Sequence, residues 1–195
     1  MHINSPGIER RDGRPPVFQD YGRYAELLAN TQETWTSTFQ ASQPERNGRT
    51  PSLVSFVGQT GAGKSTLIKL IIDLGVKEGQ KFPTPVVGAS GASVPTSEDV
   101  HLYLDPLTST TEAPTFFADC EGLQGGEREP LGAKFRRTRK KAIKTARTPL
   151  PIFEREVTWA SNTHLASREF AVTNLYPRLL YTFSNVIVFV LKNPR

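Results

Sequence analysis

The sequence lacks the residues on which several protein classes depend. It has one cysteine, Cys120, so an intrachain disulfide is excluded, and the free thiol fits a reducing compartment. The three histidines, His2, His101 and His164, are far apart and form no recognisable metal set. No apolar run approaches the roughly 20 residues of a membrane helix, and "MHINSPGIERRDGRPP" has no apolar core of a signal peptide. We therefore expect an intracellular, cytoplasmic protein.

Acidic residues are missing from residues 134–147, although the net charge of the whole chain is only +5. Eight basic residues lie there: Lys134, Arg136, Arg137, Arg139, Lys140, Lys141, Lys144 and Arg147. Such a block is most often a solvated loop or helix face. Binding to an acidic partner, to RNA or to an anionic membrane surface is the alternative. Phe135 is its only aromatic residue, so we expect no base-stacking surface and no specific nucleic-acid binding.

The chain divides at about residue 50. Residues 1–16 are rich in proline, glycine and arginine, which predicts a flexible tail. From Asp20 to Phe39 apolar residues recur at near-helical spacing, which predicts an amphipathic helix docked on the main domain. "QPERNGRTPS" has the composition of a linker. Residues 51–195 then form the main domain, with a basic insertion at about 128–150.

Strand and helix patterns alternate in residues 51–195. The strand candidates are Leu53–Val57, Val100–Leu104, Thr115–Ala118 and Val186–Leu191. "KSTLIKLIIDLG" predicts a buried helix with Gly75 as its C-cap, and Ser167–Phe183 predicts a second helix disturbed near Pro177. The pattern favours an α/β fold of three layers with a mainly parallel sheet, preceded by an N-terminal helical extension.

Glycines gather after the first strand candidate, in "VGQTGAGKST", which fits G-x-x-x-x-G-K-[ST] at every position. Glycines let the backbone curl around an anion, and the following helix presents its N-terminus to the same phosphates. Lys64 then reaches the β- and γ-phosphates, and Ser65 places its hydroxyl on Mg²⁺. The predicted phosphate-binding residues are Gly58, Gln59, Thr60, Gly61, Ala62, Gly63, Lys64, Ser65 and Thr66.

A second motif follows the strand candidate Thr115–Ala118. "DCEG" places Asp119 at the end of that strand and Gly122 three residues later, and it is the only D-x-x-G in the chain. We expect Asp119 to hold Mg²⁺ through a water and the N–H of Gly122 to reach the γ-phosphate.

Together, "VGQTGAGKST" and "ADCEGL" resemble the first and third G motifs of the translation-factor-related P-loop GTPases. "DCEGL" is similar to the D-T-E-G run of the dynamin-related large GTPases, the guanylate-binding proteins and the atlastins. The resemblance covers about Leu53–Leu123 and the strand Val186–Leu191. It implies a G domain that binds GTP with Mg²⁺, hydrolyses it with a switch-type change of conformation, and self-associates.

The resemblance also implies a switch threonine before the second strand. In "SVPTSEDVHLYLD" this is Thr96, with Ser93 and Ser97 as rivals and a plain turn residue as the alternative. Thr96 then acts with Lys64 in catalysis and shares the metal with Ser65 and Asp119.

The chain departs from the family pattern at two places, one concerning recognition of the guanine base and one concerning hydrolysis. The base-reading motif should follow Val186–Leu191, but the chain stops at Arg195, so we expect a fragment truncated after its fourth core strand. Leu123 stands where a water-orienting glutamine occurs in Ras-like proteins, and Gly61 stands where guanylate-binding proteins carry an arginine. We therefore expect slow hydrolysis by the isolated chain.

An ATP-binding P-loop ATPase and a nucleotide-dependent scaffold without turnover remain the alternatives. AAA-type and ABC-type ATPases, however, usually place a glutamate where Cys120 stands.

Overall fold

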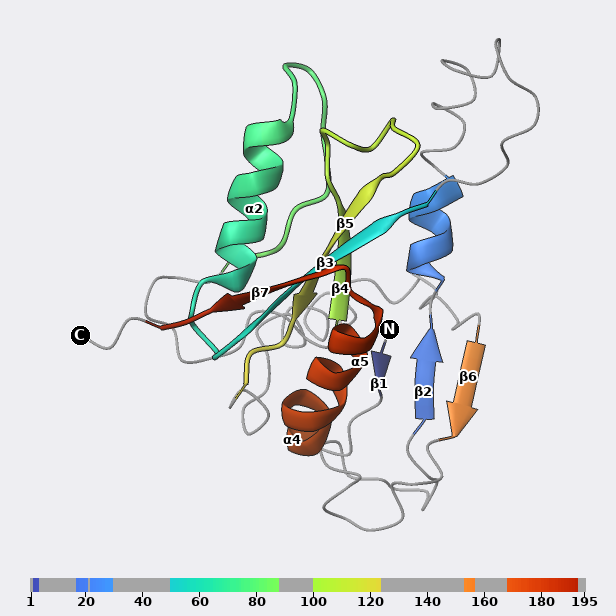
Figure 1. Ribbon diagram of the computed structural model, residues 1–195, viewed down its shortest axis with the longest axis vertical. Helices are drawn as coiled ribbons and strands as arrows, with labels where there is room; N and C mark the ends of the chain where they lie inside the picture. The colour runs from blue at the N-terminus through green and yellow to red at the C-terminus, as the bar shows by residue number, and fades with distance from the viewer. Residues whose placement is uncertain are drawn as a thin grey trace, which may run out of the picture.

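Figure 1 presents the computed structural model. It describes residues 2–3, 17–20, 22–29, 50–87, 100–123, 153–156 and 168–192. Thr96 and the basic residues of 134–147 lie outside the described residues, as do most of the predicted tail and linker.

A four-stranded sheet lies at the centre of the described structure. Its strands are β3 (Ser52–Gly58), β4 (Val100–Leu104), β5 (Thr115–Cys120) and β7 (Val186–Val190), in the order β4-β5-β3-β7. β3 runs parallel to β5 and to β7, whereas β4 runs antiparallel to β5. The sheet is therefore mixed: its central pairs are parallel as expected, and the antiparallel direction of β4 was not predicted.

One face of this sheet is covered by α2 (Lys64–Gly75), which follows directly from β3 (Figure 1). Ile68 and Ile72 are fully buried on the inner side of α2, where they pack with Phe56 of β3 and Phe117 of β5. Since side chains alternate between the faces of a strand, these contacts belong to one face only. The helix ends one residue later than expected, because the N–H of Val76 caps it by donating to the carbonyl of Ile72 at 3.0 Å.

The opposite face is covered by α4 (Arg168–Phe170), the π-helical segment η1 (Ala171–Leu175) and α5 (Tyr176–Phe183). The irregularity expected near Pro177 lies in the five residues before Tyr176, whose N–H donates to the carbonyl of Ala171. Such a bulge changes the hydrogen-bond pattern just where proline supplies no N–H. From this face Val172, Tyr176 and Leu180 pack with Val57 of β3. No helix of the described residues is long and apolar enough to cross a membrane.

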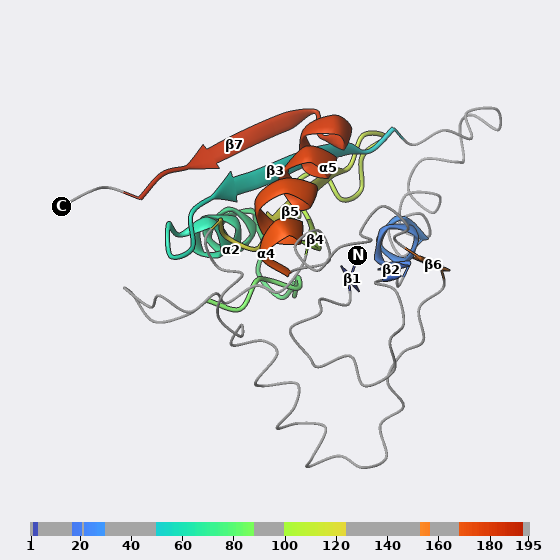
Figure 2. The ribbon, with the colours of Figure 1, turned by 90° about the horizontal axis from the view of Figure 1, so that it is seen from below.

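A smaller antiparallel sheet consists of β1 (His2–Ile3), β2 (Val17–Asp20) and β6 (Phe153–Glu156), with β2 in the middle. Figures 1 and 2 both place β2 and β6 to one side of the larger sheet. None of these strands was predicted from the sequence. Asp20 belongs to β2 and accepts the N–H of Gly22 at 2.8 Å, so the helix expected from Asp20 begins only at residue 23.

That helix covers residues 23–29 in the described structure. Its Leu27 is buried with Leu104 of β4 and Phe116 of β5. The Tyr24 ring lies 5.4 Å from the Phe116 ring, between centroids. The N-terminal segment is thereby attached to the edge of the larger sheet that carries β4.

Candidate functional site

The glycine-rich stretch lies at the carboxyl end of β3 and leads into α2. Because β3 and β5 are parallel and paired in register from Ser52 with Thr115 to Phe56 with Asp119, the end of β5 lies beside this stretch. Gly61 and Gly63 have φ angles of 77° and 95°, values in the left-handed region that favour glycine. The backbone thus bends sharply between strand and helix, as a phosphate-binding loop requires.

Two other glycines are required by close approach of backbone, and one of them, Gly58, also has a positive φ of 156°. A Cβ on Gly58 would lie 2.1 Å from the carbonyl oxygen of Val190 on β7. A Cβ on Gly122 would lie 2.4 Å from both the nitrogen and the Cα of Thr60. Both distances are far below van der Waals contact, so only glycine fits at either position.

Lys64 is the first residue of α2, and its ammonium group lies over the loop. Nζ donates hydrogen bonds to the carbonyl of Gly58 at 3.1 Å and to that of Gln59 at 3.0 Å. The side chain is only 6% exposed. Burial lowers the pKa of Lys64, and the nearby negative charges of Asp119 and Glu121 partly oppose this. A buried lysine is thus held against the carbonyls of Gly58 and Gln59 in the loop.

Ser65 and Asp119 connect the two motifs directly. The Ser65 hydroxyl donates to Oδ2 of Asp119 at 2.7 Å, and both side chains are buried. Ser65 is the second residue of α2, and Asp119 is the penultimate residue of β5. Residues 54 apart in sequence therefore place a hydroxyl oxygen and a carboxylate oxygen at one point.

These two oxygens fit Mg²⁺, which is a hard cation and takes oxygen ligands. Mg²⁺ usually binds one or two carboxylates together with waters and substrate phosphates, not an all-protein cage. No group of three or more His, Cys, Asp or Glu side chains suited to a metal occurs in the described part of the chain. Ser65 and Asp119 would hold the ion, and the remaining ligands would come from phosphate and water.

The segment after Asp119 lies against the loop. The N–H of Leu123 donates to the carbonyl of Gly58 at 3.0 Å, and the N–H of Thr60 donates to the carbonyl of Leu123 at 3.1 Å. These bonds form a short parallel bridge between Gln59 and Leu123. Gly122 is buried beneath it. The D-x-x-G residues and the glycine-rich loop are therefore one connected structure.

The structure brings some of the predicted site residues together, leaves others exposed around the loop, and does not describe Thr96. Lys64, Ser65, Asp119 and Gly122 come together as described above. Ala62 is half-buried and Gln59, Gly61, Gly63 and Thr66 are exposed around the loop and the start of α2. Thr96, predicted for both catalysis and metal binding, lies outside the described residues.

The burial of Glu121 and the contact between Thr60 and Gly122 were not predicted, although both Glu121 and Thr60 were polar candidates at the site. Glu121 is 2% exposed, and its charge acts on Lys64; its position inside D-x-x-G was the only signal in the sequence. The Thr60 hydroxyl donates to the carbonyl of Gly122 at 3.0 Å. That contact joins residues 62 apart, and no local pattern indicates it.

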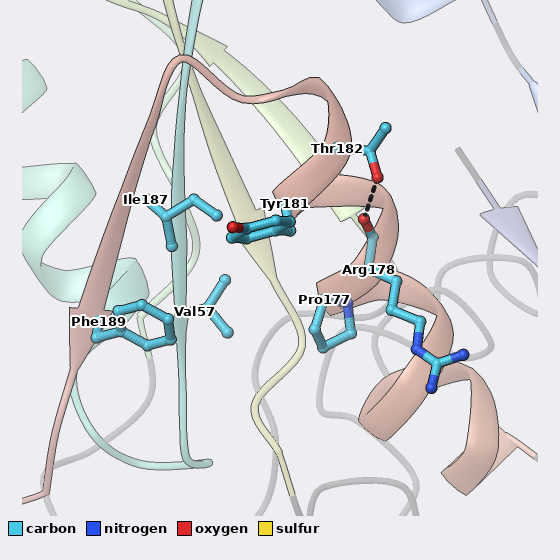
Figure 3. Close-up of a pocket in the computed structure, with 7 residues that line it drawn as sticks. All are labelled: Val57, Pro177, Arg178, Tyr181, Thr182, Ile187 and Phe189. Carbon is cyan, nitrogen blue, oxygen red and sulfur yellow. Dashed lines mark hydrogen bonds between the residues drawn. The ribbon is translucent and has the colours of Figure 1, made fainter.

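A separate groove of about 470 Å³ lies between α5 and β7 (Figure 3). Its lining residues are Val57, Pro177, Arg178, Tyr181, Thr182, Ile187 and Phe189. Arg178 is the one cation among them, and the Thr182 hydroxyl is directed to the Arg178 carbonyl at 2.8 Å. The groove offers apolar surface rather than backbone N–H groups, so its chemistry does not suit phosphate.

Comparisons with protein-family models, with curated proteins and with solved structures found no match to this chain.

Proposed function

We propose that this chain is a Mg²⁺-dependent P-loop GTPase that binds guanine nucleotide at the loop formed by residues 58–66. One observation carries the proposal. Ser65, at the start of α2, donates to Asp119, at the end of the parallel neighbour strand, at 2.7 Å. The two motifs that sequence reasoning assigned to one magnesium ion thus meet in space, with the Lys64 ammonium group beside them.

Each part of the site has a distinct task in phosphoryl transfer. The backbone from Gly63 to Thr66 presents N–H groups at a helix N-terminus, which suits the α- and β-phosphates. Lys64 turns from the carbonyls of Gly58 and Gln59 toward the β- and γ-oxygens, where it neutralises charge. Magnesium, when bound, supplies further neutralisation of the charge that develops on the phosphate oxygens.

The residue after Asp119 favours a GTPase over the ATPase alternative. AAA-type and ABC-type ATPases usually carry a catalytic glutamate there. The Cys120 side chain is 1% exposed and packs in the apolar cluster with Val57 and Val172. That position therefore directs no acid toward the loop. The resemblance of "DCEGL" to the large GTPases is the remaining argument for guanine.

Leu123 favours slow turnover. It follows Gly122 directly, and its backbone is held in the bridge with Gln59. A leucine side chain neither donates nor accepts a hydrogen bond, so it orients no attacking water. A partner that supplies the missing polar group raises such rates by about 10³–10⁵ in GTPases. For the same reason a nucleotide-dependent scaffold without turnover is the second candidate.

Nucleotide titrations with Mg²⁺ test the proposal. GTP, ATP and XTP are titrated into the wild-type chain and into Lys64→Ala. This variant loses the two charge-assisted hydrogen bonds that the lysine would donate to the β- and γ-phosphates. Triphosphate affinity should fall about 100-fold or more, at roughly 1.5–3 kcal/mol for each bond to a charged group. Lys69→Ala is the matched control, because Lys69 lies five residues further along α2 and is paired on the surface with Asp73.

Three outcomes separate the alternatives. Preference for GTP over ATP supports the GTPase, and the reverse preference supports the ATPase. Binding of GTP without release of phosphate over hours, with and without added Mg²⁺, supports the scaffold. Equal triphosphate affinity for the Lys64→Ala and Lys69→Ala variants would overturn the phosphate-binding assignment itself.

A further inference from the structure

The side chain of Thr60 occupies an unusual place between the two motifs. It belongs to the glycine-rich loop, yet its hydroxyl donates to the carbonyl of Gly122 at 3.0 Å and lies 3.3 Å from that of Leu123. Its backbone N–H also donates to the Leu123 carbonyl. One residue of the loop therefore holds two successive carbonyls of the D-x-x-G segment.

The contact also fixes how near Gly122 lies to the loop. The backbone of Thr60 is so close that a Cβ on Gly122 would lie 2.4 Å from two of its atoms and 2.6 Å from its hydroxyl oxygen. Thr60 thus contacts Gly122 with both its hydroxyl and its backbone, which leaves Gly122 little room to move toward the loop. The Gly122 N–H belongs to the preceding peptide and is joined to this carbonyl through the Gly122 Cα, so it stays beside the loop while Thr60 holds Gly122 in place.

We propose that Thr60 is a positioning residue that selects for the third phosphate of the nucleotide. This inference depends on the proposed function, in which the Gly122 N–H meets only the γ-phosphate. The α- and β-phosphates are held by the backbone that follows Thr60. Loss of the Thr60 hydroxyl therefore weakens triphosphate binding and spares diphosphate binding.

Thr60→Val is the informative variant, because valine keeps the branched shape and removes the hydroxyl. Thr60→Ser is the matched control, because serine keeps the hydroxyl and loses the methyl group. Both are titrated by calorimetry with GDP and with a non-hydrolysable GTP analogue, in the presence of Mg²⁺. Thermal melting of each ligand-free variant is measured alongside.

We expect Thr60→Val to raise the Kd of the triphosphate analogue about 3- to 10-fold, as for the loss of one hydrogen bond. The Kd for GDP should stay within about twofold, and Thr60→Ser should restore the wild-type ratio of the two constants. Equal weakening of both ligands assigns Thr60 a merely structural role and overturns the inference, as does an unchanged ratio.

The same titrations distinguish this failure from failure of the proposed function. If the wild-type chain binds both nucleotides but Thr60→Val leaves their ratio unchanged, only the role of Thr60 is wrong. If the wild-type chain binds neither nucleotide, the proposed function falls, and the inference built on it falls with it.

Discussion

The two strands that flank β3 have very different surroundings. β5 is hydrogen-bonded on both edges, by β3 and by β4, and its residues from Phe116 to Cys120 are all buried. β7 is hydrogen-bonded to β3 alone among the described strands, and its Phe189 is 69% exposed. Figure 2 shows β7 at the outer edge of the sheet, alongside β3.

The chemistry of the two sides follows from this difference. On the β5 side a strand packed on four sides delivers Asp119 to Ser65 within hydrogen-bonding distance. On the β7 side an exposed strand and the outer surface of α5 leave the apolar groove of Figure 3. A buried carboxylate needs a rigid surrounding to keep its partners, and only β5 offers one. The following predictions test how far the two sides are independent.

The largest contrast should appear in folding stability. Phe116→Ala on β5 removes a side chain that is fully buried, which typically costs about 3–5 kcal/mol. Phe189→Ala on β7 removes one that is mostly exposed and should cost less than about 1 kcal/mol. Denaturant unfolding of both variants measures the difference. Similar losses would contradict the different burial of Phe116 and Phe189.

The next largest effect should concern magnesium. Asp119→Asn keeps the size of the side chain and removes its charge. The factor by which Mg²⁺ raises triphosphate affinity should therefore be about tenfold smaller in this variant than in the wild type. Titrations with Mg²⁺ and with a chelator give this factor. Asp73→Asn on the exposed side of α2 is the control and should keep the wild-type factor. An unchanged factor in Asp119→Asn would remove Asp119 from the metal site.

A pH effect of similar size should come from Lys64. Its pKa in the ligand-free chain is lowered by burial, so it loses its proton at a lower pH than an ordinary lysine. Only the protonated form attracts phosphate, so the affinity for triphosphate should fall as the pH rises through that pKa. Above the pKa the fall should be about tenfold for each pH unit. Titrations from pH 7 to pH 10 measure the slope. Lys64→Arg, which stays charged, should bind with a flat profile.

The smallest effect should come from the groove. Tyr181 lines it from α5 and is 76% exposed. Tyr181→Ala should leave the affinity for triphosphate within about twofold, because the groove and the loop bind by different chemistry. A larger loss, measured in the same titration, would show that the groove and the loop are coupled through β3 and Val57.

Local patterns account for most of the larger sheet and for the loop. Each strand candidate between Leu53 and Leu191 coincides with a strand to within two residues, because runs of apolar and β-branched residues favour the extended conformation. The antiparallel direction of β4 was not predictable from such runs, since strand direction depends on pairing across the chain. The small sheet was missed for another reason: β1 has two residues and β2 has four, too few to form a period.

In the candidate site, too, the residues were predicted from local motifs, whereas the contacts between them were not. Lys64 and Ser65 follow from a contiguous motif, and Asp119 follows from its place at the end of a strand. That Ser65 and Asp119 lie 2.7 Å apart required the parallel pairing of β3 with β5. The contact between Thr60 and Gly122 depends on the path of the loop after β5, which no spacing in the sequence encodes.

Gly58 carries a consequence for how substitutions in the loop are interpreted. It opens the phosphate-binding motif, yet the oxygen of Val190 on the neighbouring strand already excludes a side chain there. A mutational scan scored by protein abundance should therefore deplete every replacement at position 58, even in cells where the nucleotide has no role. At Lys64 the same scan should tolerate replacements that a binding screen rejects. Comparing the two screens, position by position, separates the residues that build the loop from the residue that acts within it.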